Sequence, residues 1–233
     1  MKSAIKRILE LQPLYSATNT GEMQERGKLV RQALVSEISG LQHEIAPELG
    51  KFGQDFFVEA SDGIGRKTEL PWVRFCSKSM SPTPRDGFYV VVHFSTDGSA
   101  FHITVGCSSS QFKNGSFRTL NDADLDRRTN WARKIVKEAH GLMTSFTDLA
   151  DFGARRPLPQ SFQRARALCE TVKIDQLHNA DLVLLLREAA GYLKTIYEAQ
   201  STGRDQEPAD LDEQQVIDTI RPRKFRRSQG FGL

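Results

Sequence analysis

The sequence predicts an α+β fold, in which a central, mostly antiparallel sheet with a β-hairpin is flanked by N-terminal and C-terminal helices. Three observations favour this class. Apolar residues recur at three- and four-residue steps over residues 1–50, which is the period of amphipathic helices. Residues 55–107 contain short runs of β-branched and aromatic residues separated by turn residues, which is typical of strands. The helical period then returns from residue 121.

The N-terminal region carries two helical patterns. The first is expected to end or bend at Pro13, because proline lacks the N–H group that a continuing helix requires. The second begins near Glu22, and Pro47 and Gly50 close it. Its apolar stripe consists of Leu29, Val30, Ala33, Leu34, Ile38 and Leu41.

Four strands are expected in the middle of the chain. Phe88–Ser95 is the strongest strand signal, and Ala100–Cys107 follows it after a tight turn that contains Asp-Gly. These two segments are therefore expected to pair as a hairpin. Two shorter runs, Asp55–Ser61 and Leu70–Ser77, precede them.

The second half of the chain returns to helices. Asn121 or Asp122 is the expected N-cap of one helix, because a short polar side chain accepts hydrogen bonds from the free N–H groups of the first turn. Asn179 is the expected N-cap of another. Between these helices, residues 152–159 are expected to form a proline-interrupted loop and Ala165–Ile174 a further strand.

The composition is that of an ordinary soluble domain, with 39% hydrophobic and 26% charged residues in a chain of 233. No apolar run approaches the roughly 18 residues of a membrane helix, and charges interrupt the N-terminal apolar pattern, unlike in a signal peptide. No membrane partner is expected. Three widely spaced cysteines form no disulfide or metal-ligand pattern, so we expect a reducing, cytoplasmic location.

The net charge of +3 is too small to indicate a nucleic-acid-binding protein by itself. A local basic stretch lies between residues 61 and 85, where five cations face only Asp62 and Glu69. Such a stretch is suited to phosphate contacts, and the alternative is a solvated loop rim. The five cations are Arg66, Lys67, Arg74, Lys78 and Arg85.

Catalytic motifs are not found. The sequence has no HExxH, CxxC, GxSxG or phosphate-loop pattern, so no catalytic residue, metal or cofactor is predicted. His93 and His102 lie in the expected hairpin but lack further metal ligands, and half-exposed strand histidines are the simpler interpretation. Asp122, Asp124 and Asp126 are most simply an acidic first helical turn.

One ordered set of short motifs stands out. A strand leads into the loop Gly63-Ile64-Gly65, a Pro71-Trp72 pair opens the next strand, and Gly87-Phe88-Tyr89-Val90-Val91 leads into the hairpin. This order resembles the N-terminal DNA-recognition domain of McrB-type methyl-directed restriction enzymes. The resemblance is strongest over residues 56–106 and continues collinearly to the helix that ends near Tyr197.

The resemblance implies a module that examines one base, in some members 5-methylcytosine flipped from the duplex. Trp72 is then a pocket wall, Gly63 and Gly65 let the backbone approach DNA closely, and Phe162 is a further wall. The resemblance also makes Arg66 and Lys67 the strongest candidates for phosphate contacts. Arg74, Lys78 and Arg85 are the further candidates.

Two positions depart from the methylcytosine-reading relative. Ile64 stands where that relative has an aromatic residue, and His93 where it has an aliphatic one. These departures leave open a different base, another modification or no flipping. The alternative for Trp72 is a tryptophan of the hydrophobic core.

The predicted organisation is a recognition domain over residues 1–199 and a terminal segment over residues 200–233. Residues 201–218 are polar and acidic, typical of a linker, and residues 221–227 hold five basic residues in seven. This segment is expected to lead to a missing, nuclease-like effector domain. The alternative is a basic tail that adds nonspecific DNA affinity.

The predicted function is target recognition on double-stranded DNA in a restriction or phage-defence protein. The chain itself is not expected to cut; it delivers a nuclease or motor domain, in the same or a partner chain. Two alternatives stay open. One is a nucleic-acid-acting enzyme with an unrecognised active site, and the other is a protein-interaction adaptor that uses the N-terminal helices.

Overall fold

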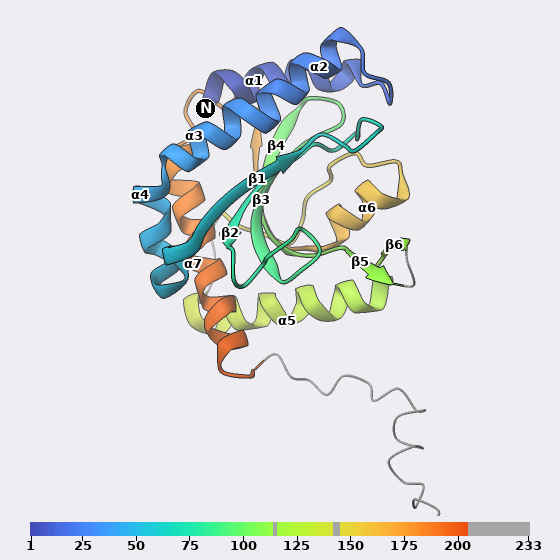
Figure 1. The fold of residues 1–233 in the computed structure, drawn as a ribbon. Helices are drawn as coiled ribbons and strands as arrows, with labels where there is room; N and C mark the ends of the chain where they lie inside the picture. Colours follow the sequence, from blue (N-terminus) through green and yellow to red (C-terminus); the bar gives the residue numbers. More distant parts are fainter. Residues whose placement is uncertain (114–115, 142–144, 205–233) are drawn as a thin grey trace, which may run out of the picture.

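A computed structural model describes residues 1–113, 116–141 and 145–204. It confirms the α+β class: a five-stranded antiparallel sheet of order β1-β2-β3-β4-β7 lies at the centre, with helices around it (Figure 1). The strands are β1 (Phe56–Ser61), β2 (Trp72–Ser77), β3 (Phe88–Phe94), β4 (Ala100–Cys107) and β7 (Arg166–Lys173). The expected hairpin is β3–β4, and the strand expected near residue 170 is β7.

The N-terminal helices lie along one side of the sheet, with a non-helical break at residues 15–20 (Figure 1). Helix α1 ends before Pro13 as expected, in a 3₁₀ turn. The expected closure at Pro47 and Gly50 is wrong, because 3₁₀ turns continue to Asp55 around a kink at Gly50, whose φ is +57°. The bounds are α1 (Lys2–Leu11), a 3₁₀ turn (Gln12–Leu14), α2 (Gly21–Lys28), a π-helical segment (Leu29–Leu34), α3 (Val35–Gly40), α4 (Gln42–Ile45) and a 3₁₀ segment (Ala46–Asp55).

Three helices follow the first four strands: α5 (Asp122–His140), α6 (Pro157–Arg164) and α7 (Leu182–Ser201). Asn121 caps α5 as expected, since its side chain accepts a bond from the N–H of Asp124. The expected loop over residues 152–159 is wrong in its second half, because Pro157 begins α6; proline is tolerated in a first turn. The expected Asn179 cap is also wrong, because Asp181 caps α7.

A second hairpin, β5 (Ser110–Lys113) and β6 (Ser116–Thr119), was not predicted. The sequence between these strands contains Asn-Gly, the strongest short hairpin signal. Within the described ranges, no helix is long and apolar enough to cross a membrane. Residues 205–233, which hold most of the predicted acidic linker and all of the basic cluster, lie outside the described residues.

The two faces of the sheet differ in chemistry. Side chains alternate between faces along a strand, and the register places each strand's apolar set on one face, packed against α1, α7 and the other helices of the core. The opposite face carries polar residues at the centre of the sheet. The apolar face includes Val73, Phe75, Val90, Val92, Phe94, Phe101, Ile103 and Val105. The polar face includes Glu59, Arg74, His93, His102 and Thr104.

Candidate functional site

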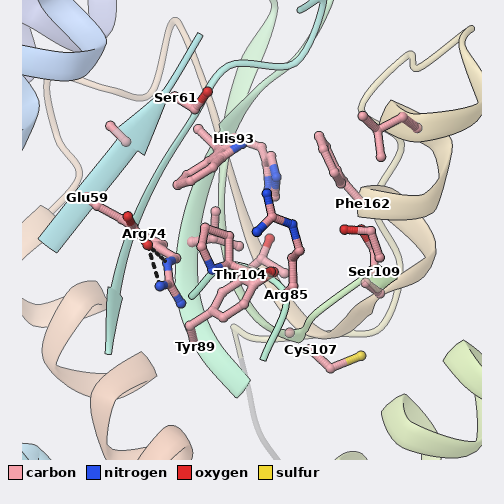
Figure 2. A pocket seen from close by; sticks show the side chains of 18 of the residues that line it. Glu59, Ser61, Arg74, Arg85, Tyr89, His93, Thr104, Cys107, Ser109 and Phe162 are labelled. Carbon is pink, nitrogen blue, oxygen red and sulfur yellow. Dashed lines mark hydrogen bonds and ion pairs between the residues drawn. The ribbon is translucent and has the colours of Figure 1, made fainter. Parts of the chain in front are cut away.

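A pocket of about 470 Å³ opens on the polar face of the sheet. Its walls come from the β1–β2 loop, from strands β1 to β4, from the β2–β3 loop and from helix α6, which lies opposite the strands (Figure 2). An engineered cavity of ~150 Å³ holds a benzene ring. The pocket therefore has room for a larger planar heterocycle with polar substituents.

The structure brings most of the predicted base-pocket residues to this one site. Gly63, Ile64, Trp72, His93 and Phe162 all line the pocket, although Phe162 lies far from the others in the sequence. The indole of Trp72 is half-buried and faces the pocket, so it is not enclosed within the helical core. Phe162 projects from α6 toward the sheet (Figure 2).

The β1–β2 loop is held from within by a buried carboxylate. Asp62 is fully buried, accepts a hydrogen bond from Lys67 Nζ at 2.6 Å and forms an ion pair with Arg31. Gly63 adopts φ +107° and Gly65 φ +74°, the left-handed region that favours glycine. At the tip, the side chain of Ile64 is 94% exposed. The loop therefore presents an apolar tip on a rigid base.

The expectation that Arg74 contacts phosphates is corrected. Its guanidinium is buried on the pocket floor, where Nε donates to Glu59 Oε1 at 2.6 Å and Nη1 donates to Ser81 Oγ at 2.6 Å. The same group lies over the ring of Tyr89, 5.0 Å from its centroid. Arg74 is inaccessible to a phosphate because its charge is already paired inside the fold; it organises the pocket.

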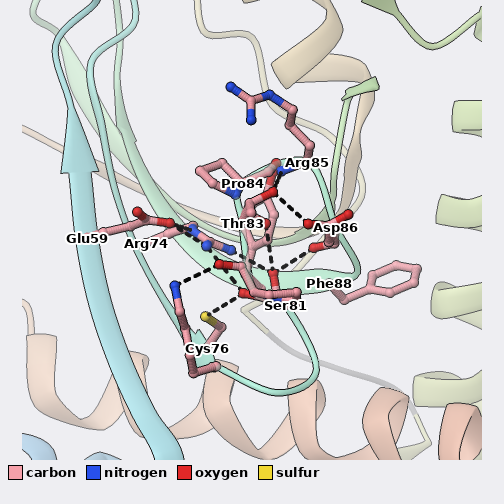
Figure 3. Close-up of polar contacts among 12 residues, drawn as sticks. Glu59, Arg74, Cys76, Ser81, Thr83, Pro84, Arg85, Asp86 and Phe88 are labelled. Carbon is pink, nitrogen blue, oxygen red and sulfur yellow. Dashed lines mark hydrogen bonds and ion pairs between the residues drawn. The ribbon is translucent and has the colours of Figure 1, made fainter. Parts of the chain in front are cut away.

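Arg74 also anchors the loop between β2 and β3 (Figure 3). Ser81 Oγ, which accepts from Arg74, donates to the carbonyl oxygen of Asp86 at 2.6 Å. Thr83 Oγ1 donates to Asp86 Oδ2 at 2.6 Å. These bonds fix the turn that carries Arg85, which is exposed and lines the pocket.

The remaining predicted phosphate contacts are placed differently from one another. Arg66 is exposed on the β1–β2 loop. Lys67 is only 13% exposed and supports the loop through Asp62. Lys78 does not line the pocket: it lies at the far end of β2 from Trp72, and its Nζ donates to the carbonyl oxygen of Pro82 at 2.7 Å. The structure therefore does not gather Lys78 with the others.

His93 lies in an aromatic stack beside the pocket. Its ring is stacked on Phe152 and Phe162, with centroid distances of 5.0 and 5.9 Å. It is 4% exposed, and among the described residues its Nδ1 has no hydrogen-bond partner. Burial lowers the pKa of His93 to about 3, so the ring is neutral at physiological pH. The expectation of a half-exposed strand histidine is therefore wrong.

His102 pairs directly with His93 across the hairpin. It is 1% exposed, and its two ring nitrogens lie 2.9 Å from Ser95 Oγ and 3.0 Å from Thr171 Oγ1. Burial lowers its pKa to about 4. Both histidines are thus neutral. In the described part of the chain, no cluster of three or more His, Cys, Asp or Glu residues is arranged to hold a metal ion.

Several pocket residues were missed from the sequence. Glu59, Tyr89 and Thr104 line the pocket, and so does Leu158 at the start of α6. Glu59, Tyr89 and Thr104 have a signal in the sequence. Side chains alternate between the two faces of a strand, and this alternation puts all three on the same face of the sheet as Trp72 and His93. Leu158 has no such signal, since α6 reaches the site only through the tertiary fold.

A family model described as the MrcB-like, N-terminal domain matches residues 10–198. The chain belongs to this family. The chain gives no significant match among curated proteins or among solved structures.

Membership in the MrcB-like family confirms the resemblance seen in the loop and strand motifs. The matched range contains α2 to α6, most of α7 and the whole central sheet, so it includes every residue that lines the pocket. A restriction-related DNA-binding module of McrB type is the function that this membership indicates.

Proposed function

We propose that this chain is the target-recognition module of a restriction or phage-defence system, and that it reads a single base extruded from duplex DNA into the pocket beside Trp72. The observation that carries the proposal is the pocket itself, about 470 Å³ on the polar face of the sheet. A flipped base needs an enclosed site with flat apolar walls and a few polar groups for its edge.

The walls supply both kinds of contact. Trp72 on strand β2 and Phe162 on helix α6 both provide aromatic surface to the pocket. The floor offers Glu59 and Thr104, while the Glu59 carboxylate is oriented by Arg74. A base edge presents hydrogen-bond donors and acceptors, and this floor contains acceptors and a hydroxyl that suit such an edge.

We assign binding to this chain and cleavage to an effector. In the pocket, the guanidinium of Arg74 is paired with the Glu59 carboxylate inside the fold, so these two groups serve the structure of the site. A nuclease or motor domain, in the same or a partner chain, then acts at the site that this module selects.

The test is a binding assay with short duplexes in unmodified, cytosine-methylated and adenine-methylated forms, measured by fluorescence anisotropy at two salt concentrations. We expect one form to bind preferentially and the preference to depend on the pocket. Phe162→Ala removes one wall, and we expect it to reduce the preference by roughly 10-fold, the ~1–3 kcal/mol typical of base stacking on an aromatic side chain.

Leu184→Ala is the matched control, because Leu184 is 56% exposed on α7, away from the pocket. Equal loss of preference in both variants would contradict a role for the pocket. Divalent-metal-dependent nicking by the purified chain would contradict the assignment of cleavage to an effector. An absence of DNA binding at low salt would instead favour the adaptor alternative.

A further inference from the structure

We infer that residues 155–158 form a second DNA-binding arm, which grips the phosphate backbone across the pocket from the β1–β2 loop. The inference rests on the proposed function, and it adds a contact surface that the sequence motifs do not indicate. Four observations carry it: the exposed cations of this segment, its apolar residue in the pocket, its bond to the loop through Glu69, and its shared packing on Tyr15.

The arm repeats the chemistry of the loop. The loop presents exposed Ile64 beside exposed Arg66, and the arm presents Leu158, 46% exposed, after exposed Arg155 and Arg156. Ile64 and Leu158 line the same pocket. Each side of the pocket thus combines an apolar tip with guanidinium groups, the pairing that DNA-bending and base-extruding proteins use to displace bases while holding phosphates.

Glu69 joins the arm to the loop. This residue lies near the end of the loop, is 6% exposed, and its Oε1 accepts hydrogen bonds from the backbone N–H groups of Arg155 and Arg156, both at 2.8 Å. One carboxylate therefore fixes the backbone that carries both arginines, and both residues remain exposed. The arm and the loop are held as one preorganised unit, which reduces the entropy lost on binding.

Tyr15 provides a second link between the two segments. Its hydroxyl donates to the carbonyl oxygen of Lys67 at 3.0 Å, and the guanidinium of Arg156 lies over its ring, 5.6 Å from the centroid. The loop and the arm thus share one aromatic support as well as one carboxylate.

The charge balance at this rim favours a polyanion. The two carboxylates of the β1–β2 loop, Asp62 and Glu69, are buried and already engaged, Asp62 with Lys67 and Glu69 with backbone N–H groups. Among the described residues, Arg66 and Arg155 form no ion pair, so their charge faces solvent. Duplex DNA, with a phosphate on each side of an extruded nucleotide, fits cations placed on both sides of one pocket.

The test compares four variants of the full chain on a labelled mixed-sequence duplex, with binding measured between about 50 and 200 mM salt. The arm variant is R155A/R156A, and the loop variant is R66A. The control is R187A/K194A, which removes the same charge from α7, where both side chains are in surface ion pairs. Thermal melts accompany each variant, and Arg155→Gln, whose side chain has no described contact, is a milder second arm variant.

We expect the arm variant to weaken binding to every duplex by roughly 10- to 100-fold and to lower the slope of log K against log salt by about two, since each phosphate contact contributes about 0.9. Arg155→Gln should lower the slope by about one, and the control should bind within about twofold of the unmodified chain. If the unmodified chain binds DNA and R66A weakens that binding, but R155A/R156A keeps the same slope of log K against log salt, the inference about the arm is wrong while the proposed function stands. If the unmodified chain does not bind the duplex, the proposed function is wrong, and the proposed arm is wrong as well.

Discussion

Mild acid is predicted to destabilise this fold through the two buried histidines. In the folded chain, burial lowers the pKa of His93 to about 3 and that of His102 to about 4. In the unfolded chain both groups return to about 6.5. As the pH falls below about 6.5, the unfolded state binds protons that the folded state does not, so stability decreases with falling pH.

The magnitude follows from the proton uptake of the unfolded state. A pH of 5 lies about 1.5 units below the pKa of each unfolded imidazole, and one unit corresponds to ~1.4 kcal/mol of folding free energy. The loss between pH 7 and pH 5 is therefore about 2 kcal/mol for each histidine and about 4 kcal/mol for the pair. This is a large part of the ~5–15 kcal/mol that stabilises a typical domain.

The assay is urea denaturation followed by circular dichroism at pH 7 and pH 5. His93→Phe keeps an aromatic ring in the stack with Phe152 and Phe162 but cannot be protonated, so we expect it to lose about 2 kcal/mol less than the unmodified chain. His43→Gln is the control, because the His43 side chain is 76% exposed and its ring is hydrated in both states. If His93→Phe and the unmodified chain lose the same stability, protonation of His93 does not oppose folding and the reasoning is wrong.

Three further predictions concern the pocket rim. Trp72→Ala should lower discrimination between duplexes while costing about 1–2 kcal/mol of stability, less than the ~3–5 of a fully buried tryptophan; a melting temperature far below that of the unmodified chain would make it a core residue. Lys67→Met should cost about 1–3 kcal/mol in urea denaturation, because buried Asp62 loses a charged partner. Gly63→Ala should disrupt the loop and weaken binding more than Gly65→Ala, since only at Gly63 would a Cβ overlap with neighbouring backbone; equal effects on binding would argue against this packing.

The sequence was informative where local pattern and local structure coincide. The β3–β4 hairpin, the Asn121 cap and the end of α1 before Pro13 all follow from short-range chemistry, and the structure agrees. The Asp181 cap was missed because Asn179, two residues earlier, offers the same side-chain chemistry, and only the backbone geometry selects between them.

The site was harder to predict because its parts meet only in the tertiary fold. Trp72, His93 and the glycine loop were identified from motif order. Arg74 was misread as a surface cation, since nothing in its own segment reveals that Glu59 and Ser81 enclose it. The link from Glu69 to residues 155–156 joins positions more than eighty residues apart, and no sequence periodicity encodes it.

The alternation of side chains through the central sheet separates two evolutionary constraints. Substitutions among Val90, Val92 and Ile103 act on the helix-covered core, whereas substitutions at Tyr89, Val91 or Thr104 change the lining of the pocket. A lineage of such domains is therefore free to acquire new target preferences at every second position of the same strands while the scaffold persists.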